Sequence, residues 1–109
     1  MHRYVSIQGD PINEDDPDVV IRDALANSKL SPNICCKIPT TASGLKAIER
    51  MIEENIPIYA TEIFGISQFV HICETYQKVS QKKDHKPMFY MSHIAGIYDE
   101  YFGKLRARE

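Results

Sequence analysis

The chain has 109 residues, 43% of them hydrophobic and 26% charged, which is ordinary globular composition and enough for one domain with a single hydrophobic core. The formal net charge of −2 gives no electrostatic reason to expect a nucleic-acid partner, and no apolar run approaches the ~18 residues of a membrane span. The three cysteines, at positions 35, 36 and 73, form no CxxC pair, which favours reduced thiols and a cytoplasmic protein.

The first predicted unit is a short strand followed by a helix. Alternating side chains predict the strand from Tyr4 to Gln8, ended by Gly9-Asp10-Pro11. After an acidic loop, Asp16 is a candidate N-cap for a helix that begins at Pro17 and ends near residue 28.

The second unit is organised around a lysine in an apolar strand that ends at Pro39. The neighbours of Lys37 are apolar on both faces, as in a parallel strand covered by helices: Ile34, Cys35, Cys36 and Ile38. An ammonium there loses hydration unless something uses it, and a partly neutral lysine can attack a carbonyl to form a Schiff base. The alternative is a lysine at a strand end that extends its amine to solvent, and this stretch alone leaves both readings open.

The helix that follows carries an apolar stripe and has three candidate N-caps, Thr40, Thr41 and Ser43. A third strand is predicted over residues 58–64, with Tyr59, Thr61 and Ile63 on one face. Ser67 is a candidate cap for a third helix, whose predicted buried side comprises Phe69, Ile72, Cys73 and Tyr76.

A solvated basic loop is predicted over residues 81–86, a fourth strand over 88–94 and a fourth helix over 99–108. Four β-α units about 30 residues apart indicate an α/β fold with a parallel sheet. Right-handed crossovers bring the carboxyl ends of all four strands to one rim, where Gln8, Lys37, Thr61 and Ser92 are expected. Their convergence favours a functional Lys37, because barrel active sites lie at that rim.

Other site types fit these residues less well. Cys35 and Cys36 point to opposite faces of a strand, which suits packing better than a zinc site with His93. Ser92 and His93 face apart for the same reason, so a nucleophile–base pair is not expected. Neither a GxGxxG nor a GxxxxGK[ST] nucleotide-binding fingerprint is present, and neither a cofactor nor a metal is predicted. For the tyrosines at positions 4, 59 and 90, the favoured interpretation is that they fill the interior of a barrel.

Several segments together resemble the transaldolase family, in which a lysine Schiff base does the chemistry of a class I aldolase. The most specific is Lys37-Ile38-Pro39-x-Thr41-x-x-Gly44-Leu45-x-Ala47-Ile48, preceded by Val5-Ser6-x-Gln8. It is followed by Glu54-Asn55-Ile56-Pro57, Thr61-x-Ile63-Phe64, the start of the third helix around Ser67 and Gln68, and Ser92. The resemblance spans roughly residues 4–102 and corresponds to the third to sixth strands of an eight-stranded (β/α)8, or TIM, barrel.

The resemblance implies transfer or aldol cleavage of a three-carbon ketol unit between sugars or sugar phosphates. Lys37 matches the Schiff-base lysine, and Thr61 matches a threonine that helps to hold a proton-transferring water. Gln8 stands where transaldolases usually have glutamate and fructose 6-phosphate aldolases have glutamine; it can orient water but cannot take its proton. Ser92 matches a substrate-contacting serine, and Tyr59 replaces an asparagine that binds substrate hydroxyls.

Two features depart from the family pattern. Ile97 stands where the family has an arginine that grips the substrate phosphate, and Ile94 replaces an aromatic residue. Residues 1–109 supply only half of a barrel, which typically needs about 250 residues. We therefore expect a single partial-barrel segment that is either part of a longer chain or a half-barrel that must associate, as in a homo-oligomer. The alternative function is a non-catalytic half-barrel serving as an assembly or sugar-phosphate-binding module.

Overall fold

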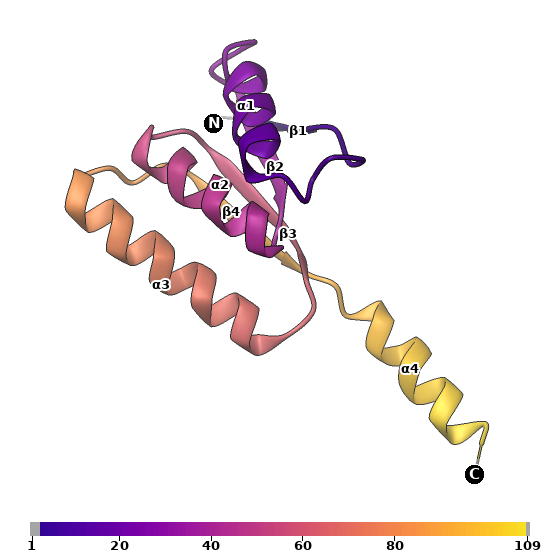
Figure 1. Ribbon diagram of the computed structural model, residues 1–109. Coiled ribbons are helices and arrows are strands. Elements are labelled where there is room, and N and C mark those ends of the chain that lie inside the picture. Colours follow the sequence, from indigo (N-terminus) through magenta and orange to yellow (C-terminus); the bar gives the residue numbers. More distant parts are fainter. Residues whose placement is uncertain (1–2, 109) are drawn as a thin grey trace.

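The computed structural model describes residues 3–108, which form four consecutive β-α units (Figure 1). The elements are β1 (Val5–Gln8), α1 (Pro17–Ser28), β2 (Ile34–Pro39), α2 (Ala42–Glu53), β3 (Ile58–Ile63), α3 (Ile66–Lys83), β4 (Phe89–His93) and α4 (Gly96–Arg106). The predicted order of elements is confirmed. None of the described helices is both long enough and apolar enough to cross a membrane.

The four strands form one parallel sheet in the order β1-β2-β3-β4, so each strand lies beside its neighbour in sequence. This is the α/β arrangement of a portion of a (β/α) barrel. Within the described residues, β1 and β4 are edge strands, so the sheet is open.

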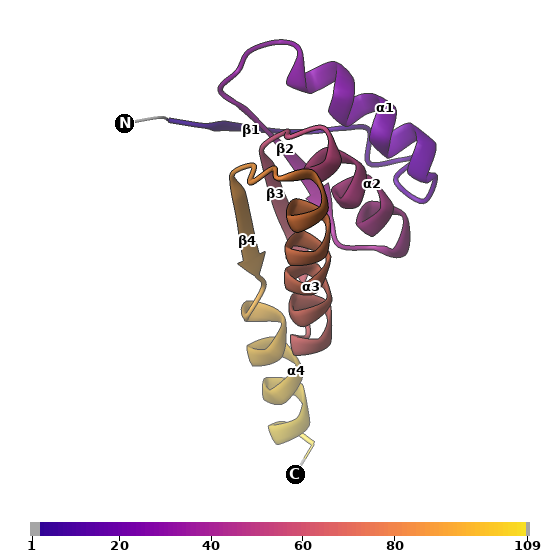
Figure 2. The same cartoon turned by 90° about the vertical axis from the view of Figure 1, so that its left-hand side faces the viewer.

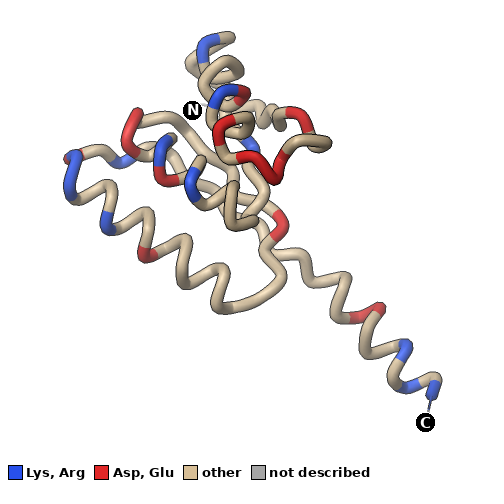
Figure 3. Tube along the Cα trace, viewed as in Figure 1, with Lys and Arg blue, Asp and Glu red and all other residues tan. Residues whose placement is uncertain are grey.

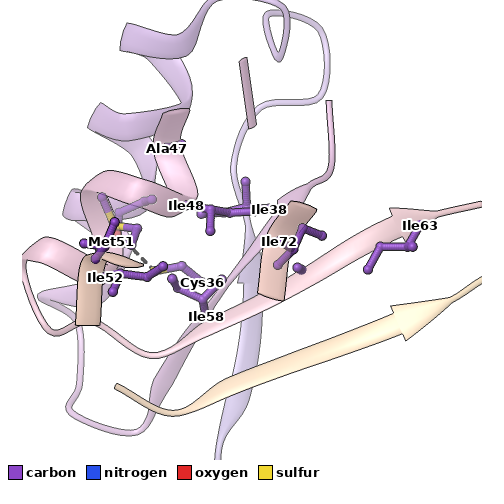
Figure 4. Packing of buried hydrophobic residues seen from close by; sticks show 12 residues of the cluster. Cys36, Ile38, Ala47, Ile48, Met51, Ile52, Ile58, Ile63 and Ile72 are labelled. Carbon is purple, nitrogen blue, oxygen red and sulfur yellow. Dashed lines mark hydrogen bonds between the residues drawn. The ribbon is translucent and has the colours of Figure 1, made fainter. Parts of the chain in front are cut away.

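Helices α1, α2 and α3 cover one face of the sheet and leave the other face uncovered (Figure 2). The core lies between α2 and the middle strands, where Ile38 of β2 packs with Ile48 and Ile52 of α2 (Figure 4). Residues 38, 48 and 52 are each no more than 1% exposed. The uncovered face is called the inner face below, because it would line the interior of a closed barrel.

Two of the helices start at caps that the sequence predicts. The Asp16 carboxylate accepts a hydrogen bond from the Asp18 N–H at 2.9 Å, directly before Pro17. Among the three candidates for α2, the cap is Thr41, whose hydroxyl accepts from the Gly44 N–H at 3.0 Å. Each cap satisfies a backbone donor that has no partner inside the helix.

A bulge in β3 overturns one prediction. Ala60 pairs with Met91 and Ile63 with His93. Between these two pairs, β3 contains two residues and β4 contains one. Ile63 is therefore turned to the helix side and is fully buried there with Ala60, not on the face of Tyr59. The extra residue breaks the simple alternation on which the prediction rested.

The predictions for α3 are also wrong in three respects. The helix is capped at Gly65 rather than Ser67, and it continues to Lys83, so the basic loop begins after residue 83. Ile72 is buried as expected, but Phe69 is 40% exposed and Cys73 is exposed.

Helix α4 starts earlier than predicted, at Gly96, and extends away from the other helices beyond the end of β4 (Figures 1 and 2). None of its residues is buried. Its exposed apolar side chains are Ile97, Tyr98, Tyr101, Phe102 and Leu105.

Candidate functional site

A single row of side chains crosses the inner face of the sheet. Gln8 of β1 is paired with Lys37 of β2, Lys37 with Tyr59 of β3, and Tyr59 with Tyr90 of β4. Paired residues on adjacent strands lie about 4.8 Å apart and share a face. The sheet thus brings Gln8, Lys37 and Tyr59 together on one face.

Lys37 is half-buried in this row, whereas its neighbours Cys36 and Ile38 are each 1% exposed on the opposite side. Its Nζ lies 5.9 Å from the centroid of the Tyr59 ring, within the range of a cation–π contact. Lys37 makes no salt bridge in the part of the chain that the structure describes. Its amine is therefore held over an aromatic ring on the open inner face.

Thr61 and Ser92 lie one step closer to the carboxyl ends of their strands. Because of the bulge, Thr61 and Glu62 together stand opposite Ser92 in the β3–β4 pair. Thr61 follows Tyr59 by two residues and is paired with Pro39, so it belongs to the inner face one step beyond Lys37. Thr61 is 6% exposed and Ser92 is half-buried.

Gln68 ties the strand ends together, and sequence reasoning assigned it no role. Its Oε1 accepts from the Phe64 and Gly65 N–H groups at 2.9 and 3.0 Å. Its Nε2 donates to the Thr40 and Glu62 carbonyls at 3.1 and 3.4 Å. A glutamine at the third helical position after a glycine cap was the available signal, since such a side chain can reach back to the cap N–H.

The backbone at Glu62 is left-handed, with φ of 59°. This conformation costs a residue with a Cβ roughly 1 kcal/mol. Glu62 lies in the bulge, so the backbone strain is located where β3 turns Ile63 toward the core.

The tyrosines on the inner face leave an open depression in front of the sheet, lined by Tyr4, Ser6, Cys35, Tyr59, Tyr90 and Met91. Phenolic and serine hydroxyls both donate and accept hydrogen bonds. The depression can therefore accommodate a polyhydroxylated molecule on the amino-terminal side of the row that contains Lys37, and Tyr59 and Tyr90 belong to both.

The adjacent cysteines face opposite ways, as predicted. Cys35 lines the inner-face depression, whereas the Cys36 thiol donates to the Ala24 carbonyl at 3.2 Å under α1. Burial raises the pKa of both thiols to about 11, because desolvation disfavours the thiolate. In residues 3–108, no group of three His, Cys, Asp or Glu side chains is placed to hold a metal ion.

His93 lies on the helix side of β4, so it does not meet Ser92. Its Nε2 is 3.1 Å from the Phe64 carbonyl oxygen, and its ring is 5.7 Å from that of Tyr98. The expectation that Ser92 and His93 face apart is confirmed.

Carboxylates gather in the loop between β1 and α1, at the rim where β1 ends (Figure 3). The Asp10 carboxylate accepts from the Ile12 N–H at 2.9 Å and the Asn13 amide at 3.0 Å. Asp23 accepts from the Asp10 N–H at 3.2 Å, and this bond, followed by the one from Arg22, lowers the pKa of Asp23. These carboxylates are thus engaged in shaping the loop.

Comparison with known proteins identifies the family of the chain. The family model described as Transaldolase/Fructose-6-phosphate aldolase matches residues 1–105. A transaldolase of Helicobacter pylori (strain HPAG1) is 33% identical over 82 residues, which are 73% of this chain and 26% of the relative.

Two further relatives give the same result. A transaldolase of Mycolicibacterium smegmatis is 35% identical over 72% of this chain and 22% of the relative. A probable transaldolase of Herpetosiphon aurantiacus is 39% identical over 47% of this chain and 23% of the relative. The chain thus spans about a quarter of the length of the curated relatives it matches. With the family model covering residues 1–105, the chain belongs to the transaldolase/fructose-6-phosphate aldolase family.

Proposed function

We propose that this chain carries the Schiff-base half of a transaldolase-like site, in which Lys37 transfers or cleaves off a three-carbon ketol unit of a sugar or sugar phosphate. The observation that supports this most is the row across the inner face, with Lys37 between Gln8 and Tyr59 and its Nζ 5.9 Å from the Tyr59 ring. Lys37 is half-buried on the uncovered inner face, next to the Tyr59 ring that also lines the depression, and this position supports access of a ketose to its amine.

In the proposed reaction, the neutral Lys37 amine attacks the ketone carbon, and the carbonyl oxygen takes up a proton to give a carbinolamine. Loss of this hydroxyl as water leaves an iminium. The hydroxyl next to the scissile bond then loses its proton, and the bonding pair of that carbon–carbon bond moves onto the iminium. An aldehyde leaves and an enamine remains on Lys37, ready to add to an acceptor aldehyde by the reverse sequence.

The other predicted residues have supporting roles in this proposal. Thr61 and Gln8 flank the β2 strand that carries Lys37 and would hold the water through which protons move. Ser92 and Tyr59 would contact hydroxyls of the substrate. We also propose that the open sheet is completed by a longer chain or by further copies, in the reducing setting of the cytoplasm that the three free thiols suit.

The alternative is a non-catalytic half-barrel that binds a sugar phosphate or assembles with a partner. The open sheet favours it, because both edge strands are unpaired within the described residues and an uncovered inner face leaves the amine in contact with bulk water. The two proposals differ in whether Lys37 becomes covalently attached to a ketose.

Borohydride trapping distinguishes them. The protein is incubated with dihydroxyacetone or fructose 6-phosphate, reduced, and weighed by intact mass spectrometry beside Lys37→Met and the matched surface variant Lys46→Met. We expect a ketose adduct in the wild type and Lys46→Met and none in Lys37→Met. A wild type that is folded by circular dichroism yet yields no adduct would favour the non-catalytic alternative.

A further inference from the structure

Gln68 is the one side chain in the described structure that joins the ends of β2 and β3 to the start of α3. Its two amide hydrogens and its oxygen form four hydrogen bonds, all with backbone groups. A primary amide has two donors and two acceptor lone pairs, so this one uses its whole capacity. Gln68 is half-buried, and three of its four bonds are partly buried, whereas the bond from the Phe64 N–H is exposed.

Two of these bonds act directly on the bulge. The Nε2 bond to the Glu62 carbonyl and the Oε1 bond to the Phe64 N–H bracket Ile63 on both sides. Glu62 is the residue with φ of 59°, a conformation that persists only where the surroundings enforce it. Gln68 supplies that enforcement from α3.

The third bond reaches β2. The Gln68 amide donates to the Thr40 carbonyl, while the Thr40 N–H donates to the Thr61 carbonyl at 2.9 Å. Thr40 lies three residues after Lys37 in the same strand-to-helix connection. The amide thus fixes the strand carrying Lys37 and the strand carrying Thr61 relative to each other.

We propose that Gln68 is a positioning residue for the Lys37 chemistry: it holds the β3 bulge so that Thr61 stands beside the Lys37 strand and opposite Ser92. This inference rests on the proposed function. Gln68 itself does not reach the inner face through any recorded contact, so it acts through Thr61. Misplacing a proton-handling group by about 1 Å can cost on the order of 100-fold in rate.

The test compares Gln68→Met, which keeps the length of the side chain but removes all four bonds, with Gln81→Met, an exposed glutamine on the same helix. Aldehyde release from fructose 6-phosphate gives kcat and KM, and borohydride trapping gives the amount of Schiff base. We expect kcat of Gln68→Met to fall roughly 10- to 100-fold while KM stays within about threefold and Lys37 still traps. Gln81→Met should behave as wild type.

A second variant guards against simple unfolding. Gln68→Glu retains the acceptor oxygens for the Phe64 and Gly65 N–H groups but, when ionised, loses the donors to Thr40 and Glu62. We expect the same selective loss of kcat, measured per folded molecule with the folded fraction taken from circular dichroism.

The inference is overturned if both Gln68 variants keep wild-type kcat, or if kcat, KM and trapping all decline in proportion to the folded fraction. If wild-type protein itself traps no ketose, the proposed function fails, which is a different result from wild-type trapping with unaffected Gln68 variants.

Discussion

Gly44 lets α2 begin directly against the end of β2. A Cβ at this position would lie 1.8 Å from the Pro39 carbonyl oxygen, a distance that no side chain can adopt. The glycine of the Lys37 segment is therefore required by a close backbone approach, which in turn determines how the Lys37 strand meets its helix.

We expect Gly44→Ala to lower the free energy of unfolding by about 1–3 kcal/mol, because β2 and α2 must separate to admit the methyl group. Urea unfolding measures the change. The matched control is Gly103→Ala, where nothing lies within 4 Å and the helix propensity of alanine should leave stability unchanged or slightly higher. Equal stability of Gly44→Ala and wild type would contradict the close approach.

The three thiols should react at very different rates. Cys35 and Cys36 are 2% and 1% exposed with pKa values raised to about 11, so near pH 8 both are buried and almost entirely protonated. Cys73 is exposed. Since the thiolate is the reacting form, Ellman's reagent should label one thiol quickly in folded protein and three in guanidinium chloride.

Cys73→Ser should abolish the fast phase. A fast phase that survives this substitution would place Cys35 or Cys36 in contact with solvent.

Sequence reasoning succeeded for individual residues where local chemistry decides the outcome. Asp16 was predicted as a cap and Thr41 was one of three candidates, because such side chains accept hydrogen bonds from backbone donors two or three residues away. The pairing of Gln8 with Lys37 agrees with a parallel sheet in which consecutive strands are neighbours, as the β-α pattern predicts. The role of Gln68 could not be seen in this way, because one of its acceptors, Thr40, is 28 residues distant.

At the scale of elements, the β-α order was predictable and the ends of β3 and α3 were not. The bulge at Glu62 places two residues of β3 opposite one residue of β4. The alternation of side chains along a strand does not predict where such a bulge occurs. Its stabilisation comes from Gln68 on the next helix, so the face of Ile63 is decided by tertiary contacts. The exposure of Phe69 and Cys73 likewise depends on which turn of α3 meets the sheet.

Helix α4 is the element with the fewest constraints. It has 11 residues and none is buried, and isolated helices shorter than about 12–15 residues are marginal in water. In hydrogen exchange followed by mass spectrometry, we expect the α4 amides to exchange much faster than those of α2, whose buried residues include Ala47, Ile48 and Met51. Equal protection of α4 and α2 would show that α4 packs against a surface supplied by another chain.

At the scale of the whole molecule, three helices cover one face of the sheet, and the inner face has no covering layer. The chain measures 52 × 32 × 29 Å, with α4 extending the long axis beyond the sheet. The proposed chemistry needs a site from which water is largely excluded, since an iminium is hydrolysed by water. Completing the barrel would both cover the inner face and pair the strand edges.

The family could be inferred from the sequence because the Lys37–Ile48 segment is specific and the other motifs follow it in the order of the family, and comparison with known proteins confirms the family. Closure of a barrel depends on how all of its strands assemble, so the pattern of four β-α units does not predict it.

The measurement that tests the central claim most directly is the location of the reduced ketose adduct by tryptic peptide mapping. Trypsin normally cleaves after Lys29, Lys37 and Lys46, and a modified Lys37 blocks the middle cleavage. The account predicts that dihydroxyacetone with borohydride produces peptide 30–46 carrying one adduct on Lys37. An adduct spread over exposed lysines such as Lys46, with peptide 30–37 released unmodified, would contradict the assignment of Lys37 as the Schiff-base residue.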